Sequence, residues 1–459
     1  MRGMRPIGST PFALALILSV HLLSTPSGIA AEPQMRQWVD VKGRKIDAKL
    51  ITVEGRNAVL ELENGKRFRY DLEKLSADDN QFITDWQSNP TFDTSLLKNI
   101  GSWPREVSVD NQVEITPVRE DAAEKEYIYR SEHFEFHLDF KLNKLLIKDW
   151  AYVFEATFKT VSEIPWNINP EAPEDLFKTY VYANRSDYIK AGGSPSSAGI
   201  YMLRSRRIMI PAASFGIKKE RGEYKKIRDV YDVTTLVHEI THQVMHEWLP
   251  DIPMWLAEGA AEYVSTIPYR GGRFNVANAK RGAREYIQNS LRYSNMIARS
   301  RGMKEKSREI DMIPLEELIP MSAREFQTRG ATLGQSEAIR AYYSSLIFTY
   351  YLMHVDDRGQ GRGIISYIDK IGERRRVLAP YRAKFEAYYA EREQFEAGLK
   401  AGKLTKPPAR PELPGHLAPY LDGDEWEAKC REIFLQGRSI EKLETELKEA
   451  YKRMGIKVK

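Results

Sequence analysis

The chain has 459 residues, of which 42% are hydrophobic and 29% charged, and its formal net charge is +5. This length exceeds one ordinary hydrophobic core, so we expect two or three domains. The net charge is small and the basic residues are dispersed, which argues against a nucleic-acid partner. The single cysteine, Cys430, excludes an internal disulfide and a zinc site built from cysteines. We expect it to be a buried apolar residue.

The N-terminus has the pattern of a secretory signal peptide. Arg2 and Arg5 precede an apolar run over 12–23, and small residues follow before the mature chain. The apolar run is short for a membrane span. We therefore expect a signal peptide over residues 1–30, cleaved near Ala30, with retention as an uncleaved anchor as the alternative. The protein is then exported, to the periplasm or the outside, with no transmembrane segment after cleavage.

Residues 35–88 predict a small domain of short strands. Apolar and polar residues alternate over 37–41, 46–53, 58–62 and 68–72, and Asn-Gly at 64–65 favours a tight hairpin turn. Strands of this length form a small β-barrel. The segment resembles the SH3-like domain of the Sla homology type in Trp38-Val39-Asp40, 43–48, Asn64-Gly65-Lys66 and Leu75-Ser76. The resemblance implies attachment to a protein or cell-envelope partner, with an inert folding cap as the alternative.

Residues 126–265 predict the N-terminal lobe of an α+β domain. The preceding stretch, 89–125, is poor in apolar clusters, and we expect a linker there. Apolar periodicity then predicts strands, a helix and a hairpin. The strands span 127–129, 134–138 and 177–182, the helix 142–161, and the hairpin 200–203 with 207–211. The charge-rich segment 217–228 predicts a solvated loop.

The chain beyond residue 265 is mainly helical in pattern. Apolar spacing predicts helical pieces at 279–289, 314–318, 322–326, 341–353, 364–369 and 382–389. We assign 266–400 to a helical C-terminal lobe. Residues 406–419 hold five prolines, which exclude a helix or a central strand. They separate a charged helix at 440–453 from the body, so we expect 401–459 to be a proline-rich linker and a helical tail.

Two histidines four residues apart, His238 and His242, carry the strongest chemical signal in the chain. On an α-helix these positions share one face, so two imidazole nitrogens can point at one metal ion. Zinc takes nitrogen and carboxylate ligands in tetrahedral geometry, and catalytic sites leave one position to water. Glu239, next to the first ligand, is placed to take a proton from that water. Asp232 is a suitable N-cap for this helix.

A second helix downstream supplies carboxylates. Pro253 can occupy the first turn of a helix. The pattern Trp-Leu-x-Glu-Gly follows at 255–259, with Glu262 one turn further on. This pattern resembles that of the gluzincin metallopeptidases, in which a second helix gives the third zinc ligand. The resemblance implies that Glu258 is that ligand and that Glu262 orients a ligand histidine.

The spacer between the two helices leaves other ligands open. Fifteen residues separate His242 from Glu258, fewer than in the best-known gluzincins. The connecting loop must be tight, and Asp251 or Glu262 as the third ligand is the alternative. His246 lies too far along the helix axis to share the ion with the first two histidines.

A wider resemblance, to secreted bacterial gluzincin-like proteins, covers roughly residues 126–375 and includes the runs 197–201 and 341–345. It implies a zincin-like fold, in which an edge strand before the active-site helix binds the peptide substrate. The candidates for this strand are Ile208, Met209 and Ile210. Related enzymes stabilise the oxyanion with a tyrosine or histidine on a downstream helix. Tyr342 is our candidate, with Tyr343 as the alternative.

The sequence therefore predicts a secreted zinc metallopeptidase that binds one Zn²⁺ per chain and hydrolyses peptide bonds through a metal-activated water. Two alternatives stay open. One is a catalytically silent zincin-fold scaffold that binds proteins, and the other is an amidase acting on cell-wall peptides. No motif for holding a substrate amine is evident, which favours an endopeptidase.

Overall fold

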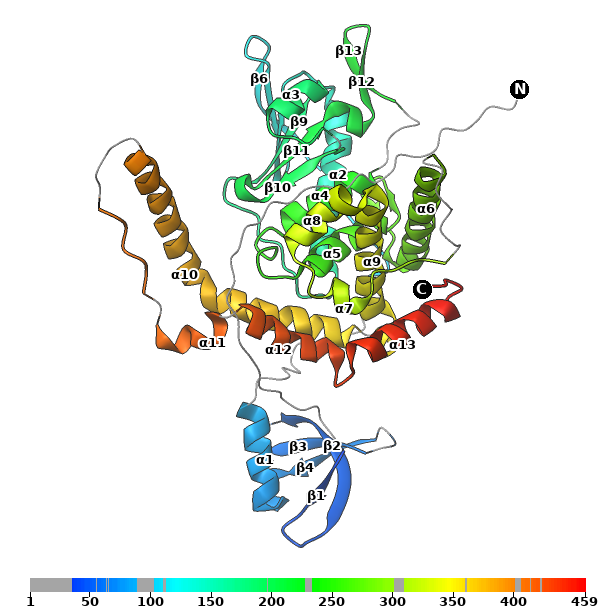
Figure 1. Cartoon of the computed structure of the whole chain (residues 1–459), viewed down its shortest axis with the longest axis vertical. Helices are drawn as coiled ribbons and strands as arrows, with labels where there is room; N and C mark the ends of the chain where they lie inside the picture. Colours follow the sequence, from blue (N-terminus) through cyan, green and yellow to red (C-terminus); the bar gives the residue numbers. More distant parts are fainter. Residues whose placement is uncertain are drawn as a thin grey trace. The chain divides into compact units, whose positions relative to one another are not determined.

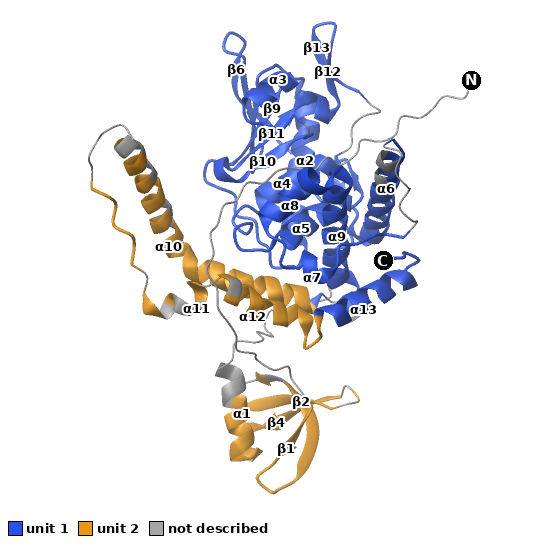
Figure 2. Ribbon diagram, in the orientation of Figure 1, with its two compact units in different colours: residues 1–21, 101–361, 440–459 blue, residues 22–100, 362–439 orange. Residues whose placement is uncertain are grey.

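In the computed structural model of the chain, the described residues are 35–54, 56–62, 64, 66–88, 103–109, 113–195, 197–227, 233–300, 309–359, 361–400, 406–412, 414–421 and 423–459. The signal peptide predicted over 1–30 and the N-cap predicted at Asp232 lie outside them. Two compact units emerge (Figure 2), with 101–361 and 440–459 in unit 1 and 22–100 and 362–439 in unit 2. Within the described part of the chain, no helix is long and apolar enough to cross a membrane.

A six-stranded mixed sheet is the frame of unit 1 (Figure 1). Its strands, in order across the sheet, are β10 (Ile200–Met202), β11 (Arg207–Pro211), β9 (Phe177–Tyr182), β8 (Phe134–Leu138), β7 (Glu126–Arg130) and β6 (Thr116–Asp121). β11, β9 and β8 run parallel to one another, and the other neighbours pair antiparallel. The strands and the hairpin predicted between 127 and 211 are confirmed, and the molecule is of mixed α/β composition as expected.

Helices pack on this sheet because each buries an apolar face. α2 (Lys144–Glu163) connects the parallel strands β8 and β9, as the predicted helix should. Its N-cap, Asn143, accepts a hydrogen bond from the backbone N–H of Leu145 at 2.8 Å, which satisfies one of the free donors of the first turn. α3 (Arg185–Lys190) follows β9, and α4 (Thr234–Val244) packs against α2, β10 and β11.

The rest of unit 1 is a helical layer. Its helices are α5 (Met254–Thr266), α6 (Ala279–Ser300), α7 (Leu315–Leu318), α8 (Ala323–Leu333), α9 (Gln335–His354) and α13 (Ile440–Arg453). Every residue of α5 is buried. A helix that is buried all round needs neighbours on every side, and α4, α6 and α9 provide them.

Four parts of unit 1 differ from the sequence predictions. Part of the predicted linker 89–125 is structured, because β5 (Val107–Ser108) pairs with β15 (Arg273–Phe274) and β6 forms an outer strand of the main sheet. The residues of β6 are largely exposed, so the strand shows no apolar alternation. The predicted loop 217–228 contains a hairpin of β12 (Ile217–Glu220) and β13 (Glu223–Lys226). A further hairpin, β14 (Tyr269–Arg270) and β15 (Arg273–Phe274), was not predicted.

The final helix is the fourth difference, since α13 is part of unit 1. Its buried residues are Leu443, Leu447, Ala450 and Tyr451. The Tyr451 hydroxyl donates to the carbonyl of Ile347 in α9 at 2.9 Å. The predicted helix is therefore confirmed, but its separation from the body is wrong.

Unit 2 includes a small N-terminal sheet of four antiparallel strands, β1 (Arg36–Val39), β2 (Lys45–Glu54), β3 (Asn57–Glu61) and β4 (Arg67–Asp71), in that order. A short 3₁₀ turn (Leu72–Lys74) and α1 (Ala77–Ser88) follow. After the turn, the chain returns to the end of β1. Ser76 N–H donates to Val39 O and Val41 N–H donates to Lys74 O, both at 2.9 Å. Trp38 lies in the core beneath this sheet.

The other part of unit 2 is helical. α10 (Arg362–Lys400) is one helix through Pro380, where separate pieces were predicted. α12 (Gly423–Leu435) packs against α10, with the Tyr367 and Phe434 rings 5.0 Å apart. α11 (Ala418–Leu421) begins within the proline-rich segment 406–419, where no helix was expected. Cys430 is fully buried, as predicted.

Candidate metal centre

The two histidines of the predicted motif face one point. They lie four residues apart in α4, whose residues 236–244 are all buried. Their Nε2 atoms are 3.0 Å apart. The Gln243 side chain donates to the carbonyl of Lys178 in β9 at 2.9 Å, which ties the end of α4 to the sheet. The fixed helix therefore presents both imidazoles in one direction.

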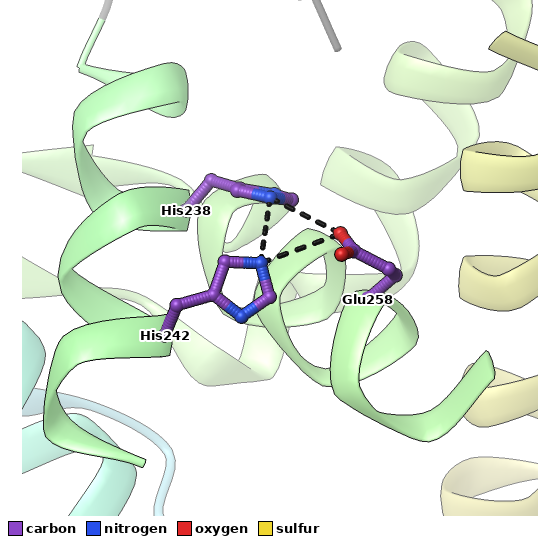
Figure 3. Close-up of side chains that lie close together, drawn as sticks. All are labelled: His238, His242 and Glu258. Carbon is purple, nitrogen blue, oxygen red and sulfur yellow. Dashed lines mark hydrogen bonds and ion pairs between the residues drawn. The ribbon is translucent and has the colours of Figure 1, made fainter. Parts of the chain in front are cut away.

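Glu258 of α5 completes the cluster (Figure 3). Its Oε2 atom lies 3.3 Å from Nε2 of His238 and 3.3 Å from Nε2 of His242. All three side chains are buried, so water does not screen them. Three potential ligand atoms on two helices thus surround one point, and these residues could hold a metal ion.

One carboxylate oxygen at this point lacks an ordinary hydrogen-bond partner. Oε2 of Glu258 is buried and has no hydrogen-bond donor among the described residues. Burial alone would raise the pKa of Glu258, but the neighbouring imidazoles of His242 and His238 lower it to about 2. Burial would likewise lower the pKa of His238, yet Glu258 and Glu262 raise it well above its ordinary value. The carboxylates therefore favour a positive charge here, which a bound cation would supply.

Glu239 lies beside the cluster and is held by the backbone. Its side chain is 1% exposed, and Oε2 accepts the N–H of Tyr201 in β10 at 3.0 Å. Burial raises the pKa of Glu239, so its carboxylate has a stronger tendency to hold a proton than an exposed one. The predicted base is thus within the same buried region, positioned by the strand next to α4.

Glu262 faces the opposite nitrogen of His238. Its Oε1 atom is 3.4 Å from Nδ1, one helical turn beyond Glu258. Tyr286 of α6 donates its hydroxyl to Glu262. The sequence predictions did not include Tyr286, because nothing in its local pattern distinguishes it from an ordinary packing residue of an amphipathic helix. The pair places a carboxylate behind His238, where it can fix the orientation of the ring.

Tyr342 of α9 lies near the cluster, and Tyr343 is engaged elsewhere. The rings of Tyr342 and His238 have centroids 6.0 Å apart. The hydroxyl of Tyr343 donates to the carbonyl of Asp311 at 2.7 Å. Of the two candidates for stabilising an oxyanion, the structure therefore brings only Tyr342 towards the histidines.

The alternative ligands do not join the cluster. Glu262 approaches Nδ1 of His238, on the other side of the ring from Glu258, and Asp251 is not among the clustered groups. The spacer is tight because successive turns close it. Trp248 N–H donates to Met245 O at 2.8 Å, and Ile252 N–H donates to Trp248 O at 3.1 Å. A short connection can therefore bring α5 back against α4.

The prediction that residues 208–210 form the edge strand that binds substrate is wrong, as the order of strands in the sheet shows. Ile208, Met209 and Ile210 lie in β11, which has β10 on one side and β9 on the other. Both of its hydrogen-bonding edges are occupied, so it cannot accept another strand. The edge strand next to α4 is β10, of which Tyr201 is the central residue. Periodicity identified both strands but does not reveal which one is outermost.

A second group of potential ligands, Glu132, His133 and Glu155, has different geometry. Nδ1 of His133 is 2.6 Å from Oε2 of Glu155, and the backbone N–H of His133 donates to Oε1 of the same carboxylate at 3.0 Å. These are the distances of hydrogen bonds. Glu155 thus fixes the turn between β7 and β8, and the group has a structural explanation without a metal.

The described residues define a mixed α/β protein in which two histidines and a glutamate, on adjacent helices, form a buried cluster that could hold a metal ion. Compared with protein-family models, curated proteins and solved structures, the chain matches none of them.

Proposed function

We propose that this protein is a zinc-dependent peptidase of the gluzincin type, with His238, His242 and Glu258 as the ligands. The spacing of the three ligand atoms is the observation that carries the proposal. Bonds of roughly 2.0–2.1 Å in a tetrahedron put neighbouring ligand atoms about 3.3 Å apart. The three separations of 3.0, 3.3 and 3.3 Å are close to that value. Two imidazoles and one carboxylate are also a donor set that zinc accepts at catalytic sites.

Zinc, when bound, supplies a Lewis acid that lowers the pKa of water and polarises a carbonyl group. The protein's own residues then have separate tasks. Glu239 takes a proton from the attacking water on its unbonded oxygen and delivers it to the leaving nitrogen. Its other oxygen stays with the Tyr201 N–H. Glu262 holds His238 through Nδ1.

Tyr342 and β10 are the proposed substrate contacts. A tyrosine hydroxyl near the ligand histidines can donate to the oxygen of the scissile carbonyl as its negative charge develops. β10 replaces β11 as the strand beside which an extended peptide would bind, with the Tyr201 N–H kept by Glu239 and therefore not available to the peptide. A peptide bound there would lie against α4.

The wider architecture is compatible with this proposal. A sheet with an edge strand above a histidine-bearing helix, followed by a second helix with a glutamate, is the arrangement expected of a zincin-like fold. For the N-terminal sheet we propose the SH3-like domain suggested by its sequence. The return of the chain to β1 after the 3₁₀ turn supports that proposal. Export to the periplasm or the outside, and attachment to a protein or envelope partner, follow as proposals.

The test is hydrolysis of a mixed peptide library by the zinc-loaded protein, before and after Glu239→Gln. This substitution keeps the shape of the side chain and removes the base. We expect the wild type to cleave and kcat to fall at least about a hundredfold in the variant, with zinc content unchanged. Cell-wall peptides in the same assay separate an amidase from a protein-cleaving enzyme. Stoichiometric zinc with no cleavage of any substrate would leave the scaffold alternative.

A further inference from the structure

The edge strand β10 is attached to α4 and its continuation at two points, both through Tyr201. The backbone N–H of Tyr201 donates to Oε2 of Glu239 at 3.0 Å. The hydroxyl of Tyr201 lies 2.6 Å from Nδ1 of His246, which follows the end of α4. One residue of the strand therefore connects the proposed base with a histidine two helical turns further along.

The polarity of the second attachment follows from its surroundings. Tyr201 is 1% exposed, so its hydroxyl needs a partner inside the protein. Burial lowers the pKa of His246 to about 4, so this imidazole is neutral near pH 7 and can accept a hydrogen bond at Nδ1. Burial also raises the pKa of the Tyr201 hydroxyl, which keeps it a donor. The hydrogen bond thus runs from Tyr201 to His246.

The other contacts of the strand are its pairing with β11 and the packing of Ile200 in a buried cluster with Tyr188 and Met209. β10 is three residues long and has a neighbour, β11, on one side only. A short edge strand can shift when its outer contacts are removed. The N–H of Tyr201 points to the outer side, where Glu239 accepts it. Any movement of the strand therefore changes the hydrogen bond that holds the carboxylate.

We infer that His246 is a positioning residue for Glu239, acting through the Tyr201 hydroxyl and the backbone of β10. The inference rests on the proposed function for its catalytic consequence, but the mechanical link can be measured without it. His246 is not among the proposed metal ligands or the proposed substrate contacts. It fixes the strand that fixes the base.

Tyr201→Phe and His246→Leu test the link, since each deletes one partner and keeps the Tyr201 backbone N–H. Hydrogen exchange of the β10 amides, measured on the metal-free full-length protein, should accelerate at least about tenfold in both variants. His246→Asn should restore the wild-type rate, because its amide oxygen takes the place of Nδ1 as acceptor. Unchanged exchange in Tyr201→Phe would overturn the inference.

Tyr129→Phe is the matched control. Tyr129 is a fully buried tyrosine of the same sheet, in β7, and its hydroxyl donates to Glu120 at 2.8 Å. Loss of this hydroxyl should lower Tm, but it should change neither the hydrogen exchange of the β10 amides nor kcat. If this control accelerated β10 exchange equally, the effect would be general loosening of the sheet and the inference would fail.

Peptide hydrolysis supplies the catalytic readout. In the zinc-loaded protein, we expect kcat to fall roughly tenfold to a hundredfold in Tyr201→Phe and His246→Leu, as misplacement of a reacting group does. Zinc content should be unchanged. The kcat of the double variant should be no lower than that of the more impaired single variant, because both substitutions break the same hydrogen bond. Additive losses, or unchanged kcat with an active wild type, would contradict the inference alone. An inactive wild type whose β10 exchange still responds would contradict the proposed function instead.

Discussion

The side chains of the cluster that could bind a cation are held in place by other side chains around them. His238 has a carboxylate on each side, Glu258 at Nε2 and Glu262 at Nδ1. An imidazole whose second nitrogen is fixed in this way has one orientation and one tautomer available for a metal. The histidine is therefore ready to bind before any ion arrives.

Tyr342→Phe tests the proposed oxyanion donor. We expect kcat to fall about a hundredfold, because the hydroxyl interacts with charge that develops only in the transition state. KM should change little, since the ground-state carbonyl carries less charge. Steady-state kinetics on one cleaved peptide give both parameters.

Tyr343→Phe is the control on the neighbouring position. It removes a hydrogen bond to the carbonyl of Asp311, which costs about 1 kcal/mol of stability. It should leave kcat unchanged. Equal losses of kcat in the two variants would contradict the role of Tyr342.

The protonation of His354 should make the stability of the protein depend on pH. Burial lowers the pKa of this imidazole to about 4, and Nε2 hydrogen-bonds with the Tyr263 hydroxyl at 2.8 Å. In the unfolded chain the pKa returns to about 6.5. Between these values only the unfolded state binds the proton, so the free energy of unfolding should fall as the pH drops from about 6.5 to about 4.

Denaturant unfolding of the wild type and His354→Gln across this range provides the measurement. The variant should be less stable at pH 7 but lose less stability on acidification, because it has no imidazole to protonate. A wild type and a variant with the same pH dependence would show that His354 is not responsible.

The sequence predicted those residues of the site that lie close to one another along the chain, and missed those that only the folded structure brings together. His238, Glu239 and His242 were predicted because their relation is local and follows from helical spacing. Glu258 and Glu262 were predicted from a recognisable pattern one helix away. Tyr286 and the Tyr201–Glu239 bond were not, because they join elements by tertiary packing alone.

The packing of α5 against α9 sets the position of Glu258. The next residue, Gly259, lies where α5 crosses α9. A Cβ atom there would be 2.1 Å from Oγ1 of Thr349 and 2.6 Å from the carbonyl oxygen of Ser345. A backbone atom cannot move aside as a side chain can. The glycine of the Trp-Leu-x-Glu-Gly pattern therefore has a packing reason, independent of the metal.

Gly259→Ala should lower the free energy of unfolding by about 1–3 kcal/mol through overpacking. It should also weaken zinc binding, since α5 must shift together with Glu258. Gly415→Ala is the control, because, apart from its two chain neighbours, no atom of the described residues lies within 4 Å of a Cβ built there. Denaturant midpoints and zinc titrations give the two readouts, and a Gly259→Ala protein of wild-type stability would contradict the close approach of the helices.

The order of the strands in the sheet could not be predicted from the sequence. β10 and β11 were both predicted as strands, but β11 was assigned the edge that β10 occupies. Both strands of a hairpin bury apolar residues, so their patterns do not rank them. β6 was missed for the opposite reason, because its residues are polar and largely exposed. Its Pro117 is compatible with an edge strand, where one row of N–H groups has no partner.

The division of the whole molecule into units also depends on contacts distant in sequence. The segment 440–459 was predicted as a tail after a proline-rich break. It returns instead to unit 1, where Ile310 N–H donates to Lys457 O and Lys459 N–H donates to Ile310 O, both at 2.8 Å. Charged residues cover the exposed face of α13, so composition alone suggests an independent helix. Its four buried residues become evident only in the packed structure.

Zinc content of the purified full-length protein tests the central claim most directly. After zinc loading and removal of loosely bound metal, the wild type should retain one zinc ion per chain. His238→Ala, His242→Ala and Glu258→Ala should each retain almost none, whereas His133→Ala and Asp251→Asn should match the wild type. Full zinc content in Glu258→Ala, or loss of zinc in His133→Ala, would contradict the assignment of the metal to His238, His242 and Glu258.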